Sequence, residues 1–456
     1  MTEETEIVDD VYALEPDLID KVLAAVENNA QSELLLVFED LHAADIADLL
    51  EQLHAEDRRA VVQLWGDHLD AEVLTELEEG VRDKIMAETP HEVLAEAVKE
   101  LETDDVVYLV EDLDEAQQDK ILESLDSADR VAVEQSLQYD EYSAGRLMQR
   151  EIVVAPQHWT VGDAIDYMRA SEHLPEVFYE VIITDPMMHP VGTVALCTIM
   201  GAPRATVLMD IMNKDFRPIP VNQSQEDVAY AFNQYNLVSA PVVDHNNRLV
   251  GVITIDDAMD VFEDEAEEDM KRLAGLGDEE LSSRVWEITK LRFPWLAVNL
   301  VTSIVASLVI ALFSDTIEAI VALAILMPIV ASMGGNAGTQ SLTVAVRAIA
   351  TRDLTTANAK RIVMRETLVG LANGLVFAVI IGVIGYAWFG SIMLGVVLAL
   401  AMVANLLVAG MAGILIPISL DKLGADPALA SGAFVTTVTD VVGFFAFLGL
   451  AAILLI

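Results

Sequence analysis

The sequence predicts a multidomain membrane protein: an α-helical superhelical N-terminal domain, an α/β tandem domain, a connecting helix and a five-helix all-α transmembrane domain. Three observations predict this class. Apolar residues recur every three or four positions between residues 11 and 142. Short β-rich runs then alternate with helical runs, and apolar segments long enough to cross a bilayer follow. We place the domains at residues 11–145, 146–262, 263–285 and 286–456.

Charge divides the chain into two parts. The totals are 74 acids and 26 bases, and residues 291–456 hold seven of each, which leaves 67 acids and 19 bases in residues 1–290. Such a surface repels nucleic acid and attracts divalent cations. We therefore expect no nucleic-acid partner. A hydrated acidic surface of the kind that salt-adapted proteins carry is the alternative, and composition does not separate the two.

Cysteine use and the N-terminus indicate where the first half lies. Cys197 is the single cysteine, so no intrachain disulfide forms, and a reducing compartment is expected. Residues 1–6 lack the basic and apolar regions of a signal peptide. We expect the first half to stay in the cytoplasm.

The first domain contains an internal repeat. Residues 41–65 align without gaps on residues 101–125. The identical pairs are Leu41/Leu101, Asp45/Asp105, Leu49/Leu109, Glu51/Glu111 and Leu53/Leu113. This spacing predicts a helical solenoid that serves as a lever or a binding surface. The scattered histidines of this domain predict surface or capping positions and not a zinc site.

The second domain repeats a strand–helix–strand–strand–helix order, and it resembles a pair of CBS motifs over residues 146–262. In that family the positions of Thr254 and Asp257 often hold a nucleotide ribose, so ATP is a candidate ligand there. Two positions depart from the family pattern. Cys197 replaces a polar or basic residue, and Leu237 replaces an aromatic one. A purely structural dimer module is the alternative.

A run of acids connects this domain to the membrane. Residues 256–269 hold nine carboxylates and no base, and helical spacing would place Asp256, Asp260, Asp264 and Glu268 in one column. A like-charge pair at about 6 Å repels by roughly 0.7 to 3 kcal/mol, depending on the effective dielectric. Hard cations such as Mg²⁺ or Ca²⁺ would relieve that repulsion. A solvated helix face or a linker is the alternative.

The apolar segments cover about 294–313, 317–345, 368–389, 391–418 and 427–455. Basic residues precede the first segment and follow the second and the fourth, while the other loops have none. The positive-inside rule then places the N-terminus in the cytoplasm and the C-terminus outside. We expect a multi-pass protein of the cell inner membrane.

Asp440 is the only carboxylate of the last segment, and three threonines, Thr436, Thr437 and Thr439, surround it. A charge at mid-bilayer costs about 3 kcal/mol by insertion scales, so it normally faces a wet cavity or a partner. An ion pathway is the first interpretation. The second interpretation is a protonated or interhelically hydrogen-bonded Asp that only holds the helix bundle together.

A Pro and Gly-rich stretch interrupts the second segment. Pro328 and the glycines of 334–340 (Gly-Gly-Asn-Ala-Gly-Thr-Gln) predict local unwinding of this helix. Asn336, Thr339 and Gln340 would add oxygen ligands at that depth. The odd number of segments and the single central acid predict a two-fold dimer with paired Asp440 residues.

All these features together resemble the MgtE family of magnesium channels over essentially the whole chain. The resemblance implies a homodimer whose pore holds hydrated Mg²⁺ at Asp440, together with the backbone of Thr436. It also implies regulatory Mg²⁺ sites in the cytoplasmic half. Their residues are Asp257, Asp260, Glu265, Glu268, Asp269 and Glu226. Ser224 and Asn236 stand where the family can place acids.

We hypothesise feedback gating. At low Mg²⁺ the acidic modules repel one another and the pore conducts, whereas at high Mg²⁺ bridging ions close it. A membrane-anchored sensor of divalent cations or nucleotide, without ion flux, is the alternative. An enzyme is not expected, because the sequence has no nucleophile with a base, no Walker loop and no HExxH motif. Selectivity among Mg²⁺, Mn²⁺, Co²⁺ and Ca²⁺ does not follow from the sequence.

Overall fold

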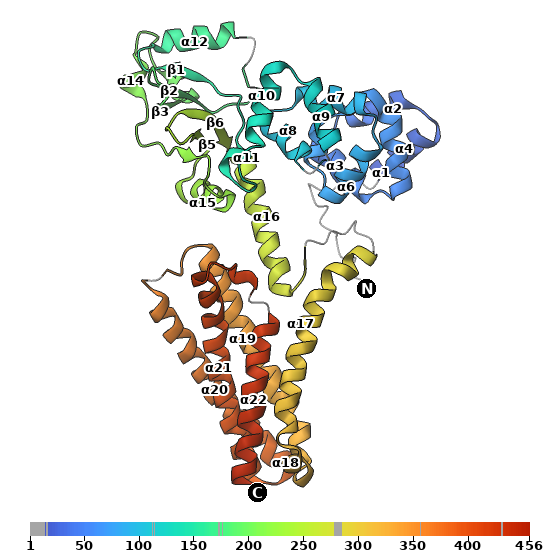
Figure 1. The fold of residues 1–456 in the computed structure, drawn as a ribbon, viewed down its shortest axis with the longest axis vertical. Helices are drawn as coiled ribbons and strands as arrows, with labels where there is room; N and C mark the ends of the chain where they lie inside the picture. The colour runs from blue at the N-terminus through green and yellow to red at the C-terminus, as the bar shows by residue number, and fades with distance from the viewer. Residues whose placement is uncertain are drawn as a thin grey trace, which may run out of the picture. The chain divides into compact units, whose positions relative to one another are not determined.

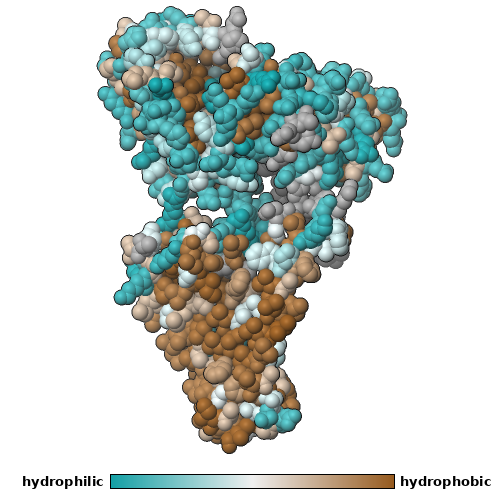
Figure 2. All heavy atoms as spheres, in the orientation of Figure 1, coloured by the Kyte–Doolittle hydropathy of each residue, from teal (hydrophilic) through white to brown (hydrophobic). Residues whose placement is uncertain are grey.

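A computed structural model describes residues 14, 17–111, 113, 115–171, 174–175, 177–277, 285–355, 357–429 and 432–456. The chain divides into two compact units, Met1–Glu263 and Asp264–Ile456. Hydropathy follows this division: polar residues cover the surface of the first unit, whereas the long helices of the second show a continuous apolar surface (Figure 2).

The first unit begins with a stack of short helices (Figure 1). These are α1 (Leu18–Glu27), α2 (Gln31–Phe38), α3 (Ala43–Gln52), α4 (Ala55–Trp65), α5 (Glu72–Thr75), α6 (Glu79–Glu88), α7 (His91–Ala97), α8 (Thr103–Val110), α9 (Glu115–Ser124) and α10 (Ser127–Ser136), with 3-10 turns at Gly66–His68 and Val98–Glu100. One apolar core joins them, because each helix turns its apolar stripe inward. The repeated segments fold as the helix pairs α3–α4 and α8–α9.

One of the histidines, His42, caps a helix. This agrees with the surface or capping positions that the sequence predicts for the histidines of this domain. The ring Nδ1 of His42 accepts a hydrogen bond from the Ala44 amide at 3.3 Å, and its own amide donates to Asp45 at 3.3 Å. These bonds satisfy amides that the first turn of α3 leaves without helical partners.

The tandem module has two three-stranded sheets. The first copy contains α11 (Ala144–Leu147), β1 (Val154–Pro156), α12 (Val161–Ala170), β2 (Glu180–Thr184), β3 (Pro190–Ala195) and α13 (Leu196–Gly201). The second contains α14 (Leu208–Ile211), β4 (Ile219–Pro220), α15 (Gln225–Tyr235), β5 (Ser239–Val243), β6 (Leu249–Thr254) and α16 (Ile255–Ala274). In each sheet the first pair of strands is parallel and the second antiparallel, so the predicted βαββα repeat is confirmed.

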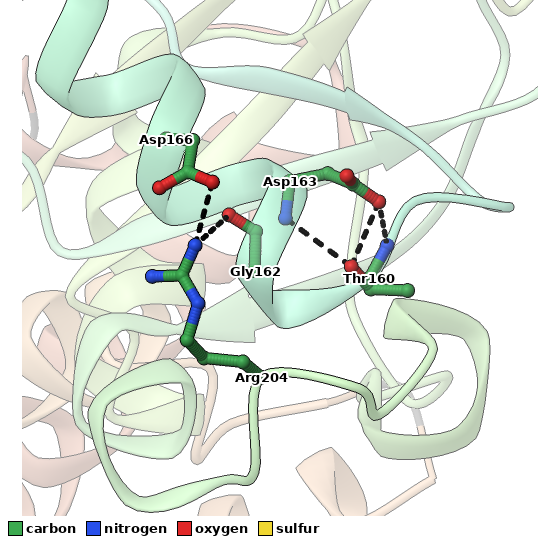
Figure 3. Close-up of polar contacts among 5 residues, drawn as sticks. All are labelled: Thr160, Gly162, Asp163, Asp166 and Arg204. Carbon is green, nitrogen blue, oxygen red and sulfur yellow. Dashed lines mark hydrogen bonds and ion pairs between the residues drawn. The ribbon is translucent and has the colours of Figure 1, made fainter.

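Side-chain bonds fix the helix starts in this module. The Thr160 and Asp163 side chains form a reciprocal capping box at α12, and Arg204 donates to the Gly162 carbonyl at 3.2 Å and to Asp166 at 2.6 Å (Figure 3). In the second copy the Ser224 hydroxyl accepts from the Asp227 amide at 3.3 Å. Thr160 and Ser224 therefore have a structural role, because each caps the first turn of a helix.

The second unit contains five helices long enough to span a membrane, as predicted. They are α17 (Val285–Ala311), α19 (Ala322–Ala350), α20 (Ala359–Phe389), α21 (Ile392–Lys422) and α22 (Gly432–Leu454), with the short α18 (Ser314–Ala319) between the first two. Helix α21 packs against α19, α20 and α22, and it is the most buried of the five. It forms the centre of this unit.

The expected unwinding of the second span is wrong. Helix α19 is continuous through Pro328 and the glycines that follow it. The glycines serve close packing instead of unwinding. A Cβ on Gly334 would lie 2.2 Å from Asn405 Nδ2 of α21, and one on Gly338 would lie 2.5 Å from Val435 Cγ1 of α22. Small residues allow helix backbones to approach closely in membranes.

Candidate ion pathway and acidic regulatory surface

Asp440 lies on α22 and is half-buried within the single chain. In the part of the chain that the structure describes, its carboxylate makes no hydrogen bond and no ion pair. The neighbouring hydroxyls donate to their own helix: Thr436 Oγ1 to the Ala433 carbonyl at 3.1 Å, and Thr439 Oγ1 to the Thr436 carbonyl at 2.9 Å. Asp440 is therefore available for a cation or its water.

Helix α19 lies directly against the turn of α22 that precedes this acid. A Cβ on Gly335 would lie 3.1 Å from Thr436 Cγ2, and one on Gly338 would lie 3.5 Å from Thr439 Cγ2. The glycine motif of one span and the Thr-Asp motif of another, about a hundred residues apart in sequence, thus form one junction.

The face of α19 away from these glycines is polar. Its exposed polar side chains are Ser332, Asn336, Thr339, Gln340 and Thr343. Their spacing of three, four and seven places them on one side of the helix. A polar face inside a bilayer normally meets water or another protein surface. The three residues predicted to add oxygen ligands all belong to this face.

Two buried polar side chains in this unit were not found by sequence reasoning. Asn405 of α21 is fully buried, and its Nδ2 donates to the Val330 carbonyl of α19 at 2.8 Å. Its Oδ1 is also buried and has no partner among the described residues. Glu366 of α20 is buried and accepts from Ser341 Oγ of α19 at 3.2 Å. Asn405 could have been found from the sequence, because it is a lone Asn within the most hydrophobic span.

The acidic connecting segment forms part of α16, and its two ends differ. At the start, Asp257 Oδ2 accepts from the hydroxyl and the amide of Thr254 at 2.7 and 3.3 Å. Near the end, Glu267 pairs with Lys271 at 2.8 Å, and Glu268 pairs with Arg272. Glu268, predicted to bind a regulatory ion, is therefore neutralised in this arrangement by a base just beyond the acidic run.

The start of α16 faces a second set of acids at the beginning of α8, which sequence reasoning missed. Burial, with the neighbouring acidic charges, raises the pKa of Glu102 to about 7 and that of Asp105 to about 6. Burial likewise raises the pKa of Asp257 to about 7, and it raises the pKa of Asp104 well above its ordinary value. We call these four residues, with Asp256 and Asp260, the acidic junction. Asp105 was visible in the sequence only as a repeat match.

The remaining regulatory candidates lie on two helices. Glu226 is exposed in the first turn of α15, whereas Asp260, Glu265 and Asp269 lie along α16. Among the described residues, no group of three or more His, Cys, Asp or Glu side chains is arranged to hold a metal ion. A divalent ion here would need water or further protein ligands.

The two residues predicted to hold a nucleotide ribose, Thr254 and Asp257, are hydrogen-bonded to each other, and Thr254 lines a cavity. A cavity of about 330 Å³ in the tandem module is lined by Thr254, Tyr179 and Ser239, and also by the carboxylates Glu151 and Glu180. Asp257 is not in this lining. Burial raises the pKa of Glu180, which accepts from Ser239 Oγ at 3.1 Å.

The second unit has five helices long enough to span a membrane, an unpartnered intramembrane acid and a polar helix face. Together with the tandem α/β module, these features define a multi-pass membrane protein with a candidate ion pathway. Comparison with known families agrees. The models described as divalent cation transporter, MgtE intracellular N domain and CBS domain match residues 327–450, 41–142 and 208–264.

Relatives cover the whole chain. It is 30% identical over 438 residues to the magnesium transporter MgtE of Bacillus subtilis, which covers 95% of this chain and 97% of that protein. It is 31% identical over 448 residues to the magnesium transporter MgtE of Thermus thermophilus, with coverage of 97% and 99%. The chain belongs to the MgtE family of magnesium transporters, and the predicted family is confirmed.

A solved structure supports the same assignment for the first half of the chain. The cytosolic domain of the Mg²⁺ channel MgtE in complex with ATP matches with a TM-score of 0.50 and 29% identity, over 53% of this chain and 99% of that one. That relative was solved with ATP bound.

Proposed function

We propose that this chain is a Mg²⁺ channel in which Asp440 and the polar face of α19 line the permeation path, and in which Mg²⁺ bound to the cytosolic acids closes the pore. The observation that carries the proposal is Asp440. It is a half-buried carboxylate within a span, without a partner among the described residues, next to a helix that presents a polar face. Mg²⁺ keeps several waters when bound, so the carboxylate and the backbone of Thr436 would act on a hydrated ion.

The pathway would be completed by a second copy of the chain. Only 6% of the most apolar window of α17 is buried within the chain, against 28 to 50% for the other four spans. A span so little covered is suited to pack on a partner. We infer a homodimer with the two Asp440 residues close to the two-fold axis, the N-terminus in the cytoplasm and the C-terminus outside the inner membrane.

Gating would run through α16. Its last turn packs with α19 and α22: Leu273 contacts the apolar cluster of Leu342 and Val435, and Arg272 pairs with Asp426. Its first turns carry three acids of the acidic junction, Asp256, Asp257 and Asp260, and these face the acids of α8. Mg²⁺ would relieve the repulsion there and at Glu265, Asp269 and Glu226, and it would compete with Arg272 for Glu268. Several weak sites could share the roughly 5.5 kcal/mol that a decisive two-state shift needs.

Uptake of Mg²⁺ into proteoliposomes tests the pore assignment. Asp440→Ala should abolish the flux, because the path loses its only intramembrane carboxylate on α22. Asp315→Asn, which removes an exposed acid of α18, is the matched control and should conduct as the wild type does. Unchanged flux through Asp440→Ala would refute the pathway. Mg²⁺ binding by a wild type that shows no flux would favour a membrane-anchored sensor.

A further inference from the structure

An open hollow lies between α4 and α6 in the N-terminal domain. Its charged lining residues are Arg58 and Arg59 from α4 and Lys84 and Glu88 from α6, and Gln63 adds an amide. The function described above makes no use of this hollow.

The charge of this hollow is opposite to that of its domain. The first 145 residues carry 42 acids and 8 bases, and three of those eight bases line this one hollow, against one acid. Its lining therefore has a formal charge of +2 inside a strongly negative domain. An excess of this kind requires a reason, because elsewhere in the domain the acids outnumber the bases severalfold.

Two of the three bases form no ion pair with a carboxylate among the described residues. Arg58 is only 9% exposed, and its guanidinium donates to the Leu50 carbonyl at 3.3 Å. Lys84 is half-buried and makes no hydrogen bond or ion pair with any residue that the structure describes. The charge of Arg58 also lowers the pKa of the Glu88 carboxyl after the stronger effect of Arg59, so this buried cation is partly compensated. An anion in the hollow would complete the compensation.

Arg59 and Glu88 form the rim. Arg59 Nε donates to one carboxylate oxygen of Glu88 at 2.6 Å, and an Nη donates to the other. Ala55, the first residue of α4, also lines the hollow, and the preceding His54 gives no side-chain cap. The amides of that first turn have no helical acceptors.

We propose that this hollow binds a small phosphate-bearing anion. A guanidinium fork matches two phosphate oxygens, an ammonium supplies a point charge, and uncapped helix amides favour a negative ligand. Arg58 and Lys84 hold the phosphate group, and Glu88 competes with it for Arg59. The hollow thereby selects a compact dianion over a carboxylate of single charge.

Binding is tested on the full-length protein in detergent, with chelator present and ionic strength held constant with NaCl. Inorganic phosphate and AMP are titrated separately by calorimetry, and ³¹P line broadening is followed in parallel. Saturable binding is expected for the wild type. Lys84→Ala should weaken it about tenfold, because a charge-assisted bond is lost. Glu88→Gln should strengthen it severalfold, because Arg59 is released.

Lys99→Ala is the matched control, since it removes a lysine of the same domain that pairs with Glu96 outside the hollow, and it should bind as the wild type does. Binding of inorganic phosphate alone identifies a free-phosphate site. Binding of AMP that Lys84→Ala weakens identifies a nucleotide phosphate. Absence of saturable binding of either probe, or equal affinities in the Lys84→Ala and Lys99→Ala variants, would overturn the proposal.

Discussion

The acidic junction supplies a quantitative prediction for Asp105→Asn. Burial and the charges of Glu72 and Asp256 raise the pKa of Asp105 from its ordinary 3.8 to about 6. Two pKa units correspond to about 3 kcal/mol, and this is an upper bound because the carboxylate is partly exposed. We expect the amide to stabilise the region around α8 by about 1 to 3 kcal/mol at pH 8 without divalent ions.

The effect depends on pH in a defined direction. The folded chain binds the Asp105 proton more tightly than the unfolded chain, so wild-type stability falls as pH rises from about 4 through about 6. The gain from the amide is therefore largest above pH 7 and vanishes towards pH 4. Mg²⁺ should stabilise the wild type more than the variant, because it relieves the same repulsion.

Hydrogen exchange of the α8 amides, measured by mass spectrometry on the full-length protein, checks this value. A gain of 1 to 3 kcal/mol would slow exchange about 5- to 150-fold at pH 8. Asp48→Asn, which removes an exposed acid on α3, is the control and should leave the rates unchanged. Equal or faster exchange in Asp105→Asn would show that repulsion in the acidic junction does not limit its stability.

Three further outcomes are expected. Because burial raises the pKa of Glu102 to about 7, acidification from pH 8 to 6 without Mg²⁺ should slow proteolysis of the first unit, and added Mg²⁺ should then protect little more. Gly370→Ala should lower the melting temperature in detergent, because its Cβ would lie 2.5 Å from a backbone carbonyl of α21 and overpacking costs about 1 to 3 kcal/mol. Gly201→Ala, with nothing within 4 Å of the added Cβ, should not. Asn405→Leu removes the hydrogen bond from α21 to α19 and should reduce Mg²⁺ flux at unchanged protein yield.

Periodicity and charge were sufficient to predict most of the architecture. The spans, the tandem module and the helical first domain follow from local repetition of apolar residues, which depends on the backbone period and not on distant contacts. Asp440 was predictable for the same reason. A single carboxylate in a continuous apolar segment is visible without any partner.

Tertiary structure alone decided where distant residues meet. Pro328 and the glycines after it are compatible with an unwound helix and also with a closely packed one, so the local sequence does not distinguish the two. The side chains of α21 and α22 lie so close to these glycines that the structure shows close packing. The acids of α8 join those of α16 across about 150 residues of sequence. The cationic hollow combines two separate helices of an acidic domain. The sequence by itself shows the periodicity of apolar residues and the charges that stand alone in apolar segments. Which charged residues from distant segments come together depends on how the helices pack, and no local sequence pattern shows this.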